Sequence, residues 1–233
     1  MNINTYMLRE YIKLILEKRD VKEAQTLGLA LMRIESGLGP AFSLYDANKL
    51  LKLSQNGEEP WVGDLKEYIL GMIVMKKNSG KCNNANEVKM VASQGFGEMM
   101  YAIAAQFSPN GIVPDRGAGT TPVAQNTWKN TLIPNASSSE PLDNQDSPVT
   151  PNKNDDCEVK YTDKNSFDIE DVHPLDKSYK FSSKVNTSEL ESNHKKFLQG
   201  MSKYMDPKKA EELLYGYAVK YFNSKLDFGS FFS

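Results

Sequence analysis

One stretch of the chain decides the fold: VKMVASQGFGEMMYAIAA, Val88–Ala105. A short apolar run rich in β-branched residues meets a Gly-x-Gly turn at Gly95 and Gly97, and good helix formers follow at once. The pattern predicts a strand, a tight turn and a helix. A helix N-terminus presents unpaired N–H groups and a positive dipole end, and glycines there let a phosphate approach the backbone. Alternatively, the two glycines serve only the turn, because a lone Gly-x-Gly is a weak motif.

The chain before this stretch predicts an antiparallel sheet. Apolar runs bounded by turn-forming residues are typical of strands joined in hairpins. Together with the run at 87–92 they make four expected strands, at 29–34, 41–45, 67–75 and 87–92. The segment 49–54 is ambiguous.

The chain after the glycine turn predicts a strand–helix–strand unit followed by another helix. We expect a helix over 98–107 and a short apolar run at 112–116 that ends in a charged pair. A further helix runs from Thr121 to Leu132, with Thr121 as its cap and Pro122 at its first position. This order indicates an α+β fold with a mixed, mostly antiparallel sheet flanked by helices.

Composition divides the chain into four parts. These are an N-terminal amphipathic helix at 1–22, the α+β domain at 23–133, an extended Pro/Ser/Asn-rich segment at 134–185 and a C-terminal helical extension at 186–233. The terminal helix packs on its own domain or in a partner's groove. The extended segment has too few large apolar residues to offset its ordering entropy alone. We therefore expect it to be held by its own domain or by neighbouring subunits.

The C-terminal extension predicts a helical hairpin and an aromatic tail. Ser188 to Glu191 fits a capping box, and Asp206-Pro207 is a second helix start. Full burial of a phenylalanine contributes about 2 kcal/mol, so we expect an aromatic tail to pack against apolar surface. The tail residues Phe228, Phe231 and Phe232 either complete this core or dock on another protein.

Charge and cysteine usage limit the classes of partner and compartment. The 233 residues carry a net charge of −2, which argues against nucleic acid as the main partner. Cys82 and Cys157 have no partner spacing, so we expect free thiols in a reducing compartment, paired only if the fold brings them together. Met1 leads directly into a charged helix without a signal peptide, and no apolar run is long enough to span a membrane. These features predict a soluble intracellular protein without membrane partners.

Two charged motifs have both a structural and a functional interpretation. Asp115-Arg116 is a possible functional ion pair at a strand end, although such pairs more often fix a loop. Asp155-Asp156-Cys157 more often forms a turn than a metal site, because adjacent carboxylates rarely both reach one ion. We therefore expect no metal, and we assign no catalytic residues.

Several positions resemble an uncharacterised family encoded by tailed bacteriophages, within the GNAT (acyl-CoA N-acyltransferase) fold. The likeness spans about 85–182 and excludes the two ends. The residues that carry it are Gly95-Phe96-Gly97, Met99-Met100-Tyr101, Ile103-Ala104, Pro114-Asp115-Arg116, Ala124, Trp128, Asp155-Asp156-Cys157, Pro174-Leu175 and Tyr179.

The resemblance implies an acyl-CoA pyrophosphate on the turn formed by Gln94, Gly95, Phe96, Gly97 and Glu98. The superfamily pattern is Gln/Arg-x-x-Gly-x-Gly/Ala, and each register of this turn misses one position. The helix expected after the short strand lacks the Tyr that many members use as general acid.

Two main functions follow. The first is a bacteriophage virion structural or accessory protein that needs no cofactor. Its terminal segments would dock on other virion proteins or on copies of itself, in the virion and, during assembly, in the host cytoplasm. The alternative is an active N-acyltransferase that uses acetyl-CoA. A phage effector acting on host proteins is a third possibility.

Overall fold

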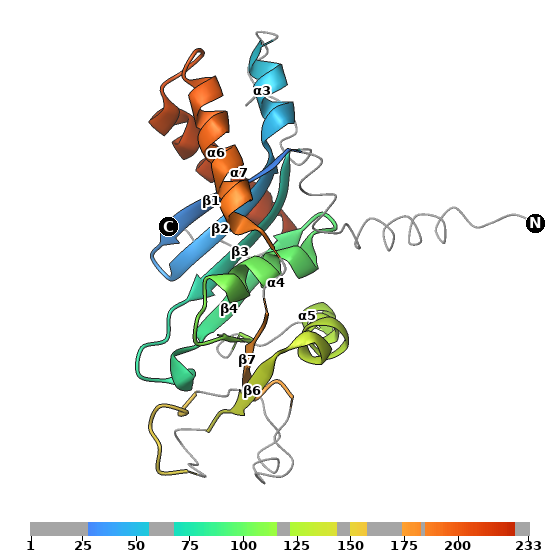
Figure 1. Cartoon of the computed structure of the whole chain (residues 1–233), viewed down its shortest axis with the longest axis vertical. Helices are drawn as coiled ribbons and strands as arrows, with labels where there is room; N and C mark the ends of the chain where they lie inside the picture. The colour runs from blue at the N-terminus through green and yellow to red at the C-terminus, as the bar shows by residue number, and fades with distance from the viewer. Residues whose placement is uncertain are drawn as a thin grey trace, which may run out of the picture.

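The computed structural model of the chain describes residues 28–55, 68–115, 122–143, 150–157, 174–182 and 185–226. Seven strands form one sheet in the order β1-β2-β3-β4-β5-β7-β6 (Figure 1). Every neighbouring pair is antiparallel except β4 and β5, which run parallel. The expected α+β class with a mixed, mostly antiparallel sheet is confirmed.

The first four strands confirm the sequence prediction to within two residues at each end. They are β1 (Leu29–Ser36), β2 (Gly39–Asp46), β3 (Ile69–Lys76) and β4 (Asn86–Ser93). The ambiguous segment is a helix, α3 (Ala47–Gln55), and the Asp46 carboxylate accepts a hydrogen bond from Lys49 N in its first turn.

The middle of the chain crosses over to the second half of the sheet. Helix α4 (Gly97–Gln106) leads to the short strand β5 (Ile112–Val113). Helix α5 (Pro122–Thr127) continues as a π-helical turn, Trp128–Leu132, and a 3₁₀ turn, Ile133–Asn135. The helix expected from Thr121 to Leu132 is helical from Pro122 onward and widens from Trp128, whereas its expected cap, Thr121, lies outside the described residues.

Two parts of the Pro/Ser/Asn-rich segment add strands to the sheet. They are β6 (Ser138–Pro141) and β7 (Lys177–Lys180), and β7 inserts between β5 and β6. The pairing gives the backbone N–H and C=O groups of these two parts their hydrogen-bond partners. These parts are thus held by the chain's own sheet.

Apolar side chains fill both faces of the sheet. On one face Ile73 packs with Met100 of α4, and on the other Met72 packs with residues of the C-terminal helices such as Phe197 and Leu214. All five side chains are at most 2% exposed. Burial of each contributes about 1.5–3 kcal/mol, so the two clusters are the main source of cohesion.

The two C-terminal helices pack against one another, α6 (Thr187–Met201) and α7 (Pro207–Leu226). The expected start of α7 is confirmed, because Asp206 accepts hydrogen bonds from Lys208 N and Lys209 N. The expected cap of α6 is wrong by two residues. Asn186, not Ser188, accepts the hydrogen bond from Glu189 N, because a side-chain amide oxygen caps as well as a hydroxyl.

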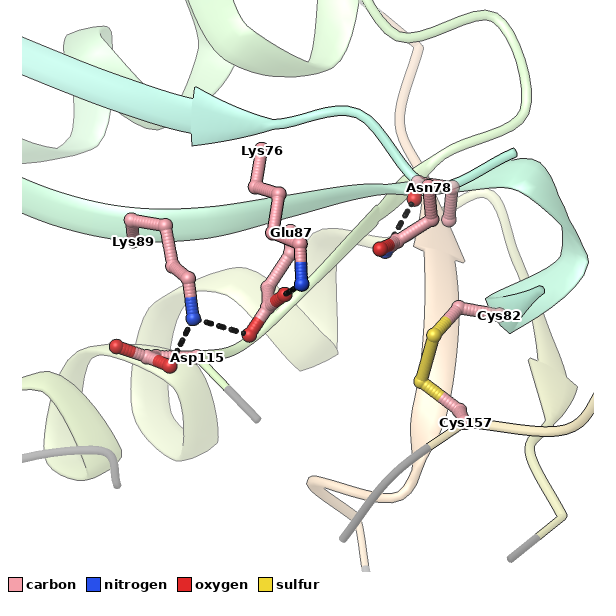
Figure 2. A network of polar contacts seen from close by, with 8 residues as sticks. Lys76, Asn78, Cys82, Glu87, Lys89, Asp115 and Cys157 are labelled. Atoms are coloured by element: carbon pink, nitrogen blue, oxygen red, sulfur yellow. Dashed lines mark hydrogen bonds and ion pairs between the residues drawn. A yellow bond between two sulfur atoms is a disulfide. The ribbon is translucent and has the colours of Figure 1, made fainter. Parts of the chain in front are cut away.

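The expectation of free thiols is wrong, because Cys82 and Cys157 form a disulfide (Figure 2). Cys82 lies in a short 3₁₀ turn, Cys82–Asn84, before β4. The segment 154–157 folds back onto this turn, where Cys82 N donates to Asp156 O and Asn83 N donates to Asn154 O. These backbone hydrogen bonds bring cysteines 75 residues apart in sequence to a Cα–Cα distance of 4.6 Å.

Several sequence predictions lie outside the described residues. They concern the N-terminal helix, Arg116 and the aromatic tail with Phe228, Phe231 and Phe232. Among the helices that the structure describes, none has the length and apolar character needed to cross a membrane.

Candidate functional site

The glycine turn joins β4 to α4 as the sequence predicts. Gly95 has a φ of 81°, a left-handed conformation that favours glycine, and α4 begins at Gly97. The ladder of α4 begins with Met100 N donating to Phe96 O, and no side chain caps this end. The amides of residues 97–99 therefore precede the ladder, at the positive end of the helix dipole.

The residues expected to bind a cofactor have different surroundings in this turn. Phe96 is buried in the core at 1% exposed, so only its backbone is available to a ligand. The Gln94 side chain donates to Ile69 O, which ties the turn to β3. Glu98 is exposed in the first turn, where its carboxylate favours the helix dipole but opposes a bound phosphate.

A partly buried ion network lies between the first half of β4 and the end of β5 (Figure 2). Lys89 Nζ lies 2.8 Å from Glu87 Oε1 and 2.8 Å from Asp115 Oδ1. Lys76 Nζ approaches the other Glu87 oxygen at 3.8 Å. One carboxylate of β4 thus holds two lysines, and Lys89 links two strands.

The backbone explains why a side chain makes this link. The parallel pairing of β4 and β5 ends at Glu87 and Val113, and Asp115 follows two residues later. The register between β3 and β4 shifts at Lys89, which lies between the partners of Val74 and Met75. A bulge of this kind re-aims the extra side chain, here toward Asp115.

Burial makes this network energetically important. The Glu87 side chain is 3% exposed, Lys89 18% and Asp115 13%. Burial alone lowers the pKa of Lys89, but its hydrogen bonds to Asp115 and Glu87 outweigh this effect and raise the pKa above its usual value. Lys89 is therefore a firmly charged cation, poorly suited to act as a base.

A second charged group lies next to the disulfide. Asp143, Asp155 and Asp156 each offer a carboxylate oxygen within 4.8 Å of the others. Asp143 is 4% exposed and accepts a hydrogen bond from Thr150 N, whereas Asp155 Oδ1 is buried without a hydrogen-bond partner. Oxygen ligands of this kind suit a hard divalent cation.

A third group joins a strand to both C-terminal helices. The Tyr45 hydroxyl lies 2.7 Å from His194 Nδ1, and His194 Nε2 lies 3.3 Å from Glu211 Oε1. Burial lowers the pKa of His194, although Glu211 acts in the opposite direction. Burial and the nearby Glu211 charge raise the pKa of Tyr45 well above its usual value, so the phenol stays protonated. The arrangement fits a neutral imidazole that accepts from Tyr45 and donates to Glu211.

Sequence reasoning found the turn and part of two of these groups, Asp115 in the ion network and Asp155 with Asp156 beside the disulfide, but missed their other members and the Tyr45–His194–Glu211 group. Of the predicted pair, Asp115 is placed with Lys89, and Arg116 lies outside the described residues. Glu87 and Lys89 could have been noticed in the sequence, because charged residues two positions apart in an apolar strand lie on the same face. His194 gave no such signal, because Tyr45 is 149 residues away.

Comparisons of the chain with protein-family models, with curated proteins and with solved structures found no match. The assignment of a function therefore rests on the residues and geometry described above.

Proposed function

We propose that this chain is a structural or accessory protein of a bacteriophage virion, built on a GNAT-like domain. The support from sequence is the phage-family pattern around Gly95 and Gly97. The support from geometry is the glycine turn between β4 and α4 in a mixed sheet. Fold alone does not imply activity, so the choice between a scaffold and an enzyme depends on the polar side chains around β4 and β5.

The observation that carries the proposal is the ion network around Lys89. In open sheets, ligands bind beyond the carboxyl ends of parallel strands, beside the crossover. In this chain β4 and β5 are the parallel pair and α4 is the crossover. Directly beyond their last paired residues, Lys89 binds both Glu87 and Asp115. A ligand entering there would have to replace both contacts of a partly buried cation, which is costly. The network favours a fixed scaffold.

The disulfide between Cys82 and Cys157 also supports a particle protein. Disulfides persist in oxidising surroundings, including virion surfaces, and are rare in the reduced cytosol. Both cysteines are at most 5% exposed, so the bond is protected once formed. It would form after release of particles assembled in the cytoplasm.

Mass spectrometry of purified phage particles tests this proposal. We expect peptides of this chain at a constant copy number per particle after density-gradient purification, with Cys82 and Cys157 linked in non-reducing digests. The control is an abundant host protein, which should decrease with each purification step. Loss of this chain in parallel with that protein would refute a virion role.

An acetyl-CoA-dependent N-acyltransferase is the second candidate, favoured by the uncapped start of α4. Calorimetric titration with millimolar CoA tests it. A Cβ on Gly97 would lie 3.4 Å from Ser93 Oγ, an ordinary contact, so Gly97→Asp and Gly97→Ala should both fold. An enzyme should lose CoA binding in Gly97→Asp, retain it in Gly97→Ala and gain affinity in Glu98→Gln. No heat of binding with the unmodified protein would exclude this candidate.

A further inference from the structure

Lysines gather at the end of the molecule formed by α3 and the turn between α6 and α7. Residues 195–209 contain five lysines and one carboxylate, and α3 adds two lysines and no carboxylate, in a chain of net charge −2. All seven side chains are exposed: Lys49, Lys52, Lys195, Lys196, Lys203, Lys208 and Lys209. We call these seven residues the lysine surface.

The two parts of the lysine surface lie side by side. Ser54 Oγ of α3 lies 3.2 Å from Met201 Sδ at the end of α6, and a Cβ on Gly200 would lie 2.8 Å from Leu51 Cδ1. Figure 1 shows α3 next to α6 at one end of the molecule, away from β6 and β7. Charges distant in sequence therefore add to one local field.

Two of these lysines lie where their charge destabilises helix α7. Lys208 and Lys209 lie in the first turn of α7, at the positive end of its dipole, and that turn contains no acidic residue. Cations at this end destabilise a helix. Asp206 caps the helix, and Glu212 lies 4.0 Å from Lys208 in an exposed pair that contributes little. Lys208 and Lys209 therefore add positive charge to an end of the helix that is already positive.

An exposed aromatic side chain lies among these lysines. Tyr204 is 47% exposed, whereas Leu38 is the other large apolar side chain exposed in the described part of the chain. Backbone hydrogen bonds from Tyr204 N and Met205 N to Met201 O fix the turn that presents it. An exposed ring beside exposed lysines suits the stacked bases and phosphates of a single strand.

We propose that the lysine surface, with Tyr204, binds single-stranded nucleic acid. Overall charge disfavours nucleic acid as the main partner, but binding depends on the local field that displaces counterions. An anionic membrane would need more apolar surface than one tyrosine provides. The inference goes beyond the virion role and does not depend on it.

Fluorescence anisotropy with a labelled single-stranded DNA oligonucleotide tests the proposal. With five lysines engaged, the logarithm of the association constant should fall with the logarithm of salt concentration at a slope of about −3.5. The triple variant Lys203→Glu, Lys208→Glu, Lys209→Glu should lose at least about tenfold in affinity at low salt. Tyr204→Ala should lose about fivefold or more on single strands and little on duplex DNA.

The matched control reverses three exposed lysines elsewhere: Lys77, Lys129 and Lys153. It changes net charge equally and should leave affinity nearly unchanged. Circular dichroism checks folding, and Lys195→Gln with Lys196→Gln is a milder second variant. Equal losses in both triple variants, or no binding by the unmodified protein, would overturn the proposal. So would binding to phosphatidylserine vesicles without binding to DNA.

Discussion

Removal of the Cys82–Cys157 disulfide should lower the free energy of unfolding by about 4 kcal/mol. The bond joins residues separated by 75 positions. Loop-closure entropy for a loop of that length is roughly 15 cal/mol/K, or about 4.5 kcal/mol at 25 °C. The loop contains β4, α4 and the strand β5, so the constraint acts on the part of the fold that carries the glycine turn. A loss of this size is a large fraction of the stability of a typical domain.

Urea unfolding with and without dithiothreitol measures this effect. The variant Cys82→Ala with Cys157→Ala is preferable to serine, because Cys157 is fully buried and a hydroxyl there would need a partner. The oxidised unmodified protein should be more stable than the variant by about 4 kcal/mol, and dithiothreitol should remove most of the difference. If oxidised protein and variant unfold at the same urea concentration, the two sulfurs do not constrain the chain and the reasoning fails.

Three further substitutions test the contributions of a partly buried histidine, a buried hydroxyl and a glycine to stability. Because the pKa of His194 is lowered on folding, its neutral form stabilises the fold above the unfolded pKa of about 6.5. That stability should be lost as pH falls through the lowered pKa, and urea unfolding at pH 7.5 and pH 5 should show a smaller loss in His194→Gln. Ser43→Ala should raise stability by about 1 kcal/mol in thermal unfolding, because the buried Ser43 hydroxyl has no hydrogen-bond partner; a lower melting temperature contradicts this. Gly111→Ala should destabilise by at least about 2 kcal/mol, because Gly111 has a φ of 95° and a Cβ there would lie 2.6 Å from Tyr179 O. An unchanged urea midpoint would contradict it.

The local order of elements could be predicted because each depends on neighbouring residues. The hairpin of β1 and β2 is closed by Ser36, whose hydroxyl accepts from Leu38 N and Gly39 N. Asp206 caps α7 from the adjacent position. Such signals are complete within a few residues, so no knowledge of the tertiary fold is needed to interpret them.

The polar sites could be predicted only in part, because they join distant segments. The disulfide needs a segment that folds back across 75 residues, and β7 enters the sheet between strands that precede it in the chain. Asp155 and Asp156 were visible as a pair, but Asp143 joins them through tertiary contacts, among them backbone hydrogen bonds to residues 155 and 157. Composition correctly marks this segment as polar without indicating that it completes the sheet.

Strand β4 carries the ion network and leads into the glycine turn, and the two have opposite consequences for an anionic ligand. The turn leaves amides of α4 ahead of the helix ladder, an arrangement that suits an anion. Glu98 adds a negative charge in the first turn of α4, and further back along β4 Lys89 is held by Glu87 and Asp115. A site selected for an anionic carrier would leave a cation available to that carrier, whereas here two carboxylates neutralise the buried lysine. Under the virion proposal the turn is kept while this lysine is neutralised, and CoA titration of Gly97→Asp and Glu98→Gln distinguishes that proposal from the acyltransferase candidate at the turn itself.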